Sequence, residues 1–290
     1  MLPAMAKKPS IAIVGPGRLG TALVRHLSQA GYKIAALIGR EVNVTKPRTQ
    51  STAPRLRTRV PTIESALLNA NVIWFCVPDR EISRAASALA AKVDWSGKTA
   101  FHSSGALSSH ELDVLRRRGA AVASVHPLMT FVRGAVPSLE GVPFALEGDK
   151  NALRIAQKIV RDLGGEPFKI RAEDKVAYHT WGAFASPLLV ALLVSAEQVA
   201  RVAGVSASDA RRKMLPILRQ TIENYGRLGP AGAFSGPWVR GDAEVVRQHL
   251  RILRRIPAAR DVYLSLGKAS LNRLPVQQKK RLQKTLKQYF

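Results

Sequence analysis

Residues 11–31 read IAIVGPGRLGTALVRHLSQAG and carry the strongest signal for the fold. It opens with a short run of branched apolar residues, 11–14, of the kind that forms a strand buried on both faces. Gly15, Gly17 and Gly20 follow at the spacing G-x-G-x-x-G, and apolar residues then recur at helical intervals as far as Gly31. The sequence therefore predicts a strand, a tight turn and a helix in succession.

Each of the three glycines has a separate task in a dinucleotide-binding turn. The first permits the sharp turn, the second lets a pyrophosphate approach the backbone, and the third lets the helix pack on the strand. The helix N-terminus then offers unpaired N–H groups and the positive end of its dipole. Ordinary glycine turns share this spacing, but the strand before it and the helix after it are the context that nucleotide binding requires. We predict a cofactor site here that includes Arg18 and Leu19.

Composition limits the class of protein. The chain has 290 residues, of which 46% are hydrophobic and 22% charged, which is typical of a soluble globular protein with two domains. Lys and Arg number 45 against 20 Asp and Glu, giving a formal charge of +25. Such a charge is compatible with nucleic acid, an anionic membrane or small anionic ligands, or with a solvated surface, which we favour. Because no DNA-binding motif accompanies the charge, nucleic acid is not an expected partner.

Cys76 is the single cysteine of the chain, which excludes an internal disulfide and a zinc site built from thiolates. We expect no metal, and the N-terminal residues have no apolar core long enough for a signal peptide, so the expected location is the cytoplasm. An uncharged run at residues 180–196 reaches the lower length limit of a membrane span. It contains Gly182 and Pro187, and we interpret it as a buried helix, with no membrane association.

The choice of cofactor depends on the end of the second predicted strand, residues 33–38. That end lies about twenty residues after the glycine motif, where dinucleotide folds place the residue that reads the adenosine ribose. A carboxylate there, such as Glu41, would bind the ribose hydroxyls of NAD, whereas the guanidinium of Arg40 would pair with the 2′-phosphate of NADP. Since Lys46 and Arg48 follow, we favour NADP over NAD.

Further strands are predicted at 57–60, 72–77, 100–101, 121–125, 142–146 and 167–170, which gives an α/β Rossmann-like domain of about eight strands over residues 1–170. Polar groups follow two of these strands: Ser103, Ser104 and Gly105 after one, and His126 after the next. Open α/β sheets bind ligands at the carboxyl ends of their strands. We therefore expect these residues to contact cofactor or substrate, although a structural histidine and a helix cap remain open as alternatives.

Residues 171–290 lack strand-like runs, and we predict an all-α second domain. In its first helix Lys175, His179, Gly182 and Ser186 stand at offsets of 0, 4, 7 and 11, so that they share one helical face. That face either lies toward the nicotinamide or is simply exposed to solvent. A lysine beside a positively polarised cofactor and a histidine should have a lowered pKa. Pro187 should kink or break the helix.

The loop at residues 236–242, GPWVRGD, is rich in turn residues. Arg240 and Asp242 can pair with each other, Asp242 can cap the next helix, or both can line a site.

Together these motifs resemble those of the Rossmann-like proteins that carry the domain of unknown function 2520, relatives of pyrroline-5-carboxylate reductases and β-hydroxyacid dehydrogenases. The matching stretches are GPGRLG (15–20), VPD (77–79), HSSGA (102–106), HPL (126–128), K-x-x-Y-H (175–179) and GPWVRGD (236–242). The resemblance implies an NAD(P)-binding domain, to which Val77, Pro78 and Asp79 contribute. It also implies a helical domain like that of 6-phosphogluconate dehydrogenase, and homodimers formed through the helical domains.

The resulting hypothesis is an NADP-dependent oxidoreductase acting on a small carbonyl, imine or hydroxy-acid compound. Lys175 would stabilise charge on the substrate or donate a proton, with His179 as its partner or alternative. Ser104, with the backbone at Gly105, would hold a substrate carboxylate, and His126 and Arg240 complete the predicted substrate contacts.

The chain departs from the family at one position, because Pro187 stands where related proteins usually have an asparagine. Ser186 could supply a weaker hydrogen bond there, or activity could be lost. A non-catalytic NADP-binding regulator or scaffold is therefore the alternative.

Overall fold

The computed structural model describes residues 8–39 and 70–289. The chain forms two compact units, Met1–Ala183 and Phe184–Phe290, and each is described by itself. The sequence placed the boundary near residue 171, whereas the two compact units divide after Ala183. Helix α5 (Lys175–Ala185) belongs largely to the first unit, because it buries side chains against strands of the sheet.

The first unit is built on a sheet in the order β2-β1-β3-β4-β5-β6-β7. The strands are β1 (Ile11–Val14), β2 (Ile34–Ile38), β3 (Val72–Phe75), β4 (Thr99–His102), β5 (Ala121–Pro127), β6 (Pro143–Gly148) and β7 (Glu166–Lys169). All neighbours pair in parallel except β5 and β6. The predicted α/β class is confirmed, with seven strands in the described residues. The strand predicted at 57–60 lies outside them.

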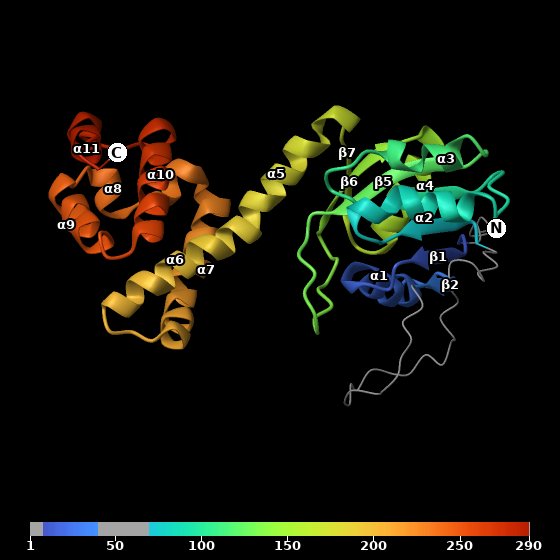
Figure 1. Cartoon of the computed structure of the whole chain (residues 1–290), viewed down its shortest axis with the longest axis horizontal. Helices are drawn as coiled ribbons and strands as arrows, with labels where there is room; N and C mark the ends of the chain where they lie inside the picture. Colours follow the sequence, from blue (N-terminus) through green and yellow to red (C-terminus); the bar gives the residue numbers. More distant parts are fainter. Residues whose placement is uncertain (1–7, 40–69, 290) are drawn as a thin grey trace, which may run out of the picture. The chain divides into compact units, whose positions relative to one another are not determined.

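Helices cover both faces of this sheet (Figure 1). Because strand side chains alternate between faces, Ile11 and Ile13 pack in one cluster with α1 (Arg18–Gln29) and α4 (Lys150–Asp162). Ala12 and Val14 pack in the other, with α2 (Ile82–Ala90) and α3 (Asp113–Arg116). Single 3₁₀ turns precede α2, α3 and α5 at Asp79–Glu81, Ser109–Leu112 and Ala172–Asp174. The parallel strands β1, β3, β4 and β5 therefore end at the same edge of the sheet, where the predicted polar residues lie.

The second unit is helical, as predicted. It contains α6 (Pro187–Val202), α7 (Ala207–Ala233), α8 (Gly236–Arg240), α9 (Ala243–Leu253), α10 (Pro257–Arg273) and α11 (Lys279–Leu286). Its core joins α9, α10 and α11. Ser186, with φ −129° and ψ −82°, separates α5 from α6, which confirms the break expected at Pro187.

The prediction that residues 180–196 form a buried helix is wrong. No residue of α6 is buried, and Leu188, Val190 and Val194 are exposed. By length and apolar composition alone, Ala172–Val202 is a segment that could cross a membrane, and it is the one such segment within the described residues. The helix contacts α7 and α10 along part of its surface, so its remaining apolar side chains have no cover within the described chain.

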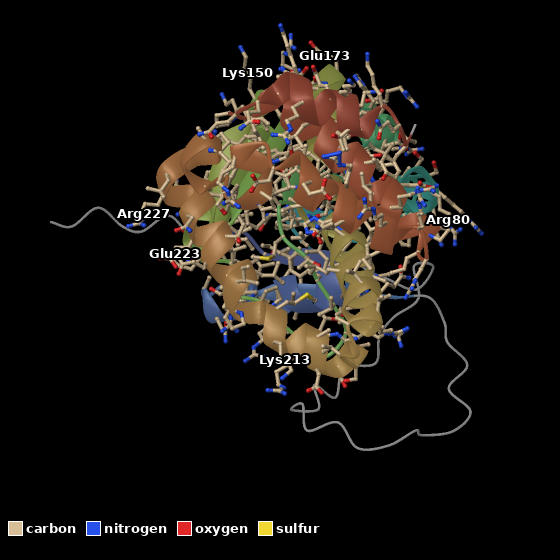
Figure 2. The ribbon with its side chains drawn as sticks, turned by 90° about the vertical axis from the view of Figure 1, so that its left-hand side faces the viewer. Arg80, Lys150, Glu173, Lys213, Glu223 and Arg227 are labelled. Atoms are coloured by element: carbon tan, nitrogen blue, oxygen red, sulfur yellow. The ribbon has the colours of Figure 1, made fainter. Side chains whose placement is uncertain are left out.

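Charged side chains project from the surface of both units. Figure 2 shows Arg80, Lys150, Lys213 and Arg227 pointing away from the ribbon. The side chain of Arg80 is 85% exposed, although it lies 3.7 Å from the Glu81 carboxylate. These side chains agree with our interpretation that the excess positive charge is largely solvated.

Candidate functional site

The three glycines of the turn after β1 differ in the space around them. Gly15 has φ +103°, and a Cβ there would lie 2.8 Å from the carbonyl of Cys76, so the fold itself requires glycine. A Cβ on Gly20 would lie 2.1 Å from the carbonyl oxygen of Gly15. Gly17 differs, because its Cβ would meet nothing within 4 Å. The first and third glycines are thus needed for packing, and the second borders open space.

Helix α1 begins in that open space with unpaired donors. Gly17 is its N-cap and supplies no side-chain cap, and the first bond of the helix runs from the Thr21 amide to the Gly17 carbonyl at 2.9 Å. The N–H groups of residues 18–20 consequently have no partner among the described residues. A hollow of about 1040 Å³ adjoins them, lined in part by Gly39, Val77 and Pro78. This arrangement fits the pyrophosphate of a dinucleotide.

The loop after β4 uses its serine hydroxyls internally. Ser103 Oγ accepts a hydrogen bond from the indole of the buried Trp74 at 2.7 Å. Ser104 Oγ donates to the carboxylate of Asp79 at 2.8 Å and accepts from the amides of residues 106 and 107. These hydroxyls hold the loop to β3 and to the 3₁₀ turn that begins at Asp79, whereas we predicted that they contact cofactor and substrate. A ligand would have to displace existing bonds to reach Ser104 Oγ.

Lys175, the first residue of α5, is fully buried against this loop. Its amine donates to the Ser104 carbonyl at 2.9 Å and to Ser124 Oγ at 2.5 Å, and Ser124 Oγ in turn donates to the same carbonyl at 3.2 Å. Burial lowers the pKa of Lys175 to about 8, and the charges of Glu147 and Asp79 offset part of that effect. The predicted direction of the pKa shift is confirmed, but desolvation is its main cause.

The structure adds Tyr178 and Ser124 to the predicted residues. Tyr178 is buried and its hydroxyl lies 2.8 Å from Nδ1 of His126, and burial raises the pKa of the phenol to about 12. Tyr178 lies three residues after Lys175, on the same helical face, and this spacing was the available signal. Ser124 is a polar residue at a buried position of β5, which the sequence pattern did not reveal.

Gly105 allows two imidazole rings to approach the backbone. A Cβ on Gly105 would lie 2.7 Å from Cδ2 of His179 and 3.0 Å from Nε2 of His126. His179 is exposed, and its ring centre is 6.4 Å from that of His126. Gly182, one turn further along α5, has the side chain of Leu128 as its near neighbour.

Of the predicted stripe, Lys175 and His179 therefore lie together at the sheet edge with His126 and Gly105. Ser186 and Arg240 belong to the second unit, where Arg240 pairs with Asp242 at 2.8 Å. Arg40 lies outside the described residues, so the preference for NADP over NAD stays a prediction.

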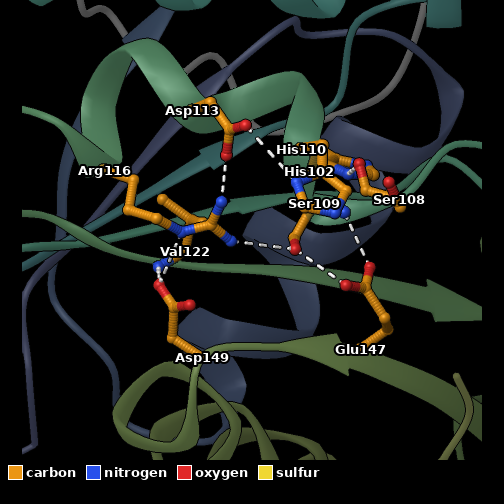
Figure 3. A network of polar contacts seen from close by, with 9 residues as sticks. All are labelled: His102, Ser108, Ser109, His110, Asp113, Arg116, Val122, Glu147 and Asp149. Carbon is orange, nitrogen blue, oxygen red and sulfur yellow. Dashed lines mark hydrogen bonds and ion pairs between the residues drawn. The ribbon is translucent and has the colours of Figure 1, made fainter. Parts of the chain in front are cut away.

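A polar network holds the other end of the loop (Figure 3). His102 Nδ1 accepts from the Ser104 amide at 3.1 Å and Nε2 donates to the Ser108 carbonyl at 2.9 Å, which fixes one neutral tautomer. Glu147 on β6 accepts from the amide and the hydroxyl of Ser109 at 2.6 and 2.8 Å. Arg116 connects Ser109 with acidic side chains of α3 and of the turn before α4. These bonds fix the residues between His102 and Ser109, which we call the pinned loop. The Ser104 carbonyl of this loop accepts the hydrogen bond from Lys175.

Comparisons with known proteins agree with this architecture. Residues 4–127 match the Rossmann-like domain, and residues 142–270 match the domain of unknown function DUF2520. A Rossmann-like match followed by a DUF2520 match therefore runs along most of the chain, as its motifs indicated. None of the curated proteins matches it.

Solved structures share the fold at low identity. A proposed NADP oxidoreductase from Bacteroides fragilis superposes with a TM-score of 0.69 at 19% identity, covering 90% of this chain and 97% of that one. A reductive aminase from Aspergillus terreus in complex with NADPH gives 0.64 at 15%, covering 96% and 99%. A pyrroline carboxylate reductase from Plasmodium falciparum with NADP bound gives 0.56 at 13%, covering 90% and 97%. These identities establish a common fold.

A side chain at position 17 should abolish nucleotide binding without unfolding the protein. The Cβ of Gly17→Val would occupy space where the structure has no neighbour, so we expect unchanged thermal unfolding but loss of NADPH affinity by at least tenfold in calorimetry. Gly226→Val, at a position in α7 that is equally free of neighbours, is the matched control and should bind normally. Undiminished NADPH affinity in Gly17→Val would contradict a pyrophosphate site at this turn.

The buried imidazoles should make the fold acid-sensitive. Burial is the main cause that lowers the pKa of both His102 and His126 to about 4, from 6.5 in an unfolded chain. Between these values the unfolded chain binds more protons, so the free energy of unfolding falls as the pH drops from 6.5 to 4. The loss at pH 5 is about 2 kcal/mol per histidine.

Urea denaturation at pH 7.5 and pH 5 measures this difference. His126→Gln should remove part of it, because that imidazole is one of the two whose pKa burial lowers. Equal stability at the two pH values would show that neither imidazole is held neutral.

Proposed function

We propose that this protein is an NADP-dependent oxidoreductase that acts on a small carbonyl, imine or hydroxy-acid compound. The observation that carries the proposal is the edge of the sheet where β1, β4 and β5 all end. The helix that follows β1 begins there without a side-chain cap. The buried Lys175, whose pKa is lowered, lies beside the ends of β4 and β5. Ligands bind at this edge of open α/β sheets. The fold shared with proteins whose structures contain NADPH or NADP supports the same class.

A bound nicotinamide would supply or accept the hydride, and the residues of the chain would position the substrate and stabilise charge. With a pKa of about 8, Lys175 is mostly protonated at neutral pH. As a cation it would stabilise negative charge developing on a substrate oxygen. Two of its three protons are bound by Ser104 and Ser124, so the third is available to a ligand if the pinned loop moves. The exposed His179 is the second candidate for proton transfer.

A non-catalytic NADP-binding regulator is the second candidate function. Pro187 favours it, because proline supplies no amide at the position where the family resemblance leads us to expect an asparagine. The complete burial of the Lys175 amine favours it as well. Normal NADPH binding without turnover of any keto acid, imine or hydroxy acid would support this alternative.

Replacing Lys175 by methionine separates catalysis from folding. Methionine removes a buried charge whose pKa shift corresponds to roughly 3 kcal/mol, and the two lost hydrogen bonds offset much of that gain. We therefore expect a melting temperature within a few degrees of the wild type, with kcat/KM reduced about a hundredfold or more. NADPH oxidation followed by absorbance measures the effect on any substrate found in a screen. Full activity in Lys175→Met would exclude the catalytic role.

We further propose that a second copy of the chain covers the apolar surface of α6 and α7. Exposed large apolar side chains gather on these helices: Leu188, Val190, Leu192, Val194, Val199, Val202, Leu215, Ile217, Ile222, Tyr225 and Leu228. Large exposed apolar side chains in this number on two packed helices indicate an interaction site. The proposal accounts for a helix that is apolar but unburied within one chain.

The oligomeric state tests this proposal. Wild-type protein should sediment as a dimer, and Ile217→Glu, at a side chain that is 68% exposed, should weaken association by at least tenfold. Lys213→Glu on the same helix is the control and should remain dimeric. A monomeric wild type at micromolar concentration would overturn the proposal.

A further inference from the structure

The pair formed by His126 and Tyr178 determines which atom of the imidazole carries its proton. The Tyr178 hydroxyl has two acceptors within reach, Nδ1 of His126 at 2.8 Å and the backbone carbonyl of His126 at 3.4 Å. A hydroxyl forms good hydrogen bonds at 2.5–3.0 Å, so Nδ1 is the better acceptor by a wide margin. Nδ1 then carries no proton, and in a neutral ring the proton lies on Nε2.

The ring is held neutral by its surroundings. Burial lowers its pKa to about 4, and the charge of Lys175 acts in the same direction. His126 is therefore unsuited to donate a proton as an imidazolium at neutral pH. It is suited to polarise a ligand atom through a neutral N–H group.

Nε2 of His126 is open to a ligand. It has no hydrogen-bond partner among the described residues. It is also not among the fully buried side-chain atoms that lack a partner, which in the described residues are the Nε atoms of Arg247 and Arg260, so it is accessible. The atom borders Gly105, whose amide also has no partner among the described residues. Two free N–H groups thus occur next to each other where β4 and β5 end.

We propose that His126 Nε2–H donates a hydrogen bond to the reacting heteroatom of the substrate, with Tyr178 as the positioning residue that fixes the tautomer. This inference rests on the proposed function and narrows its substrate class. An N–H donor binds an atom with a free lone pair, such as a carbonyl oxygen or a neutral imine nitrogen. It cannot donate a hydrogen bond to the nitrogen of an N-alkylated iminium ion, which has no lone pair. The site therefore selects uncharged acceptors over iminium cations.

Nitrogen NMR of protein labelled with ¹⁵N-histidine tests the tautomer without any substrate. The His126 signal, identified by its loss in His126→Gln, should show a protonated Nε2 and an unprotonated Nδ1 at pH 7. Tyr178→Phe should abolish this bias. Tyr263→Phe is the matched control, because Tyr263 makes the equivalent contact with His249 at 2.9 Å in the helical unit. A His126 ring protonated on Nδ1 in the wild type would overturn the inference.

Turnover with NADPH tests the substrate class. We expect reduction of cyclohexanone to exceed that of an N-methylated cyclic iminium ion. His126→Leu should lower kcat/KM for the ketone on the order of a hundredfold, and His126→Gln, which keeps an N–H donor, should recover part of that loss. Preferential reduction of the iminium ion would overturn the inference. Normal NADPH binding without turnover of either compound, or of any keto acid, imine or hydroxy acid, would instead contradict the proposed function, and with it the substrate part of the inference, while leaving the tautomer in place.

Discussion

The burial of a single amine organises the edge of this sheet. Lys175 brings a charge out of water at the start of α5, and the Ser104 carbonyl and Ser124 hydroxyl at 2.9 and 2.5 Å compensate for part of the lost hydration. Its contacts join the loop after β4, strand β5 and helix α5, which are distant in sequence. Burial lowers the pKa of the amine. His126 is kept neutral mainly by its own burial, and the charge of Lys175 acts in the same direction. Packing therefore determines the protonation of both groups.

Such an arrangement is stable only if the loop that provides the carbonyl cannot relax. Ser104 is held through its hydroxyl to Asp79 and through its amide to His102, and Ser109 is held by the buried carboxylate of Glu147. Buried polar groups that are fully bonded specify one conformation, whereas partly bonded ones are costly. The free N–H groups of residues 18–20 and of Gly105 stand out against this background, because nearly all their neighbours are satisfied. They are the natural positions for a ligand.

The sequence predicted much of the fold because local patterns determine it. The run 11–31 has strand and helix periodicity around glycines that the turn requires, and β1 and α1 follow it closely. It predicted less of the site, since tertiary contacts decide the roles of side chains. Ser103 and Ser104 read as ligand contacts but bond to Trp74 and Asp79, which are brought near by strand pairing. Tyr178 was given no role of its own, because that role depends on His126 lying beside it. Residues 180–196 were interpreted as buried because apolar composition does not reveal where the covering surface comes from.

The decisive experiment is a crystal structure of the protein grown with NADPH. We expect the pyrophosphate on the amides of residues 18–20, with the nicotinamide at the sheet edge formed by Lys175, His126 and Gly105. We also expect that Gly15 and Gly20 keep their positions, because packing already fixes both. A nucleotide bound elsewhere, or a pyrophosphate at the turn whose nicotinamide lies away from Lys175 and His126, would contradict the account.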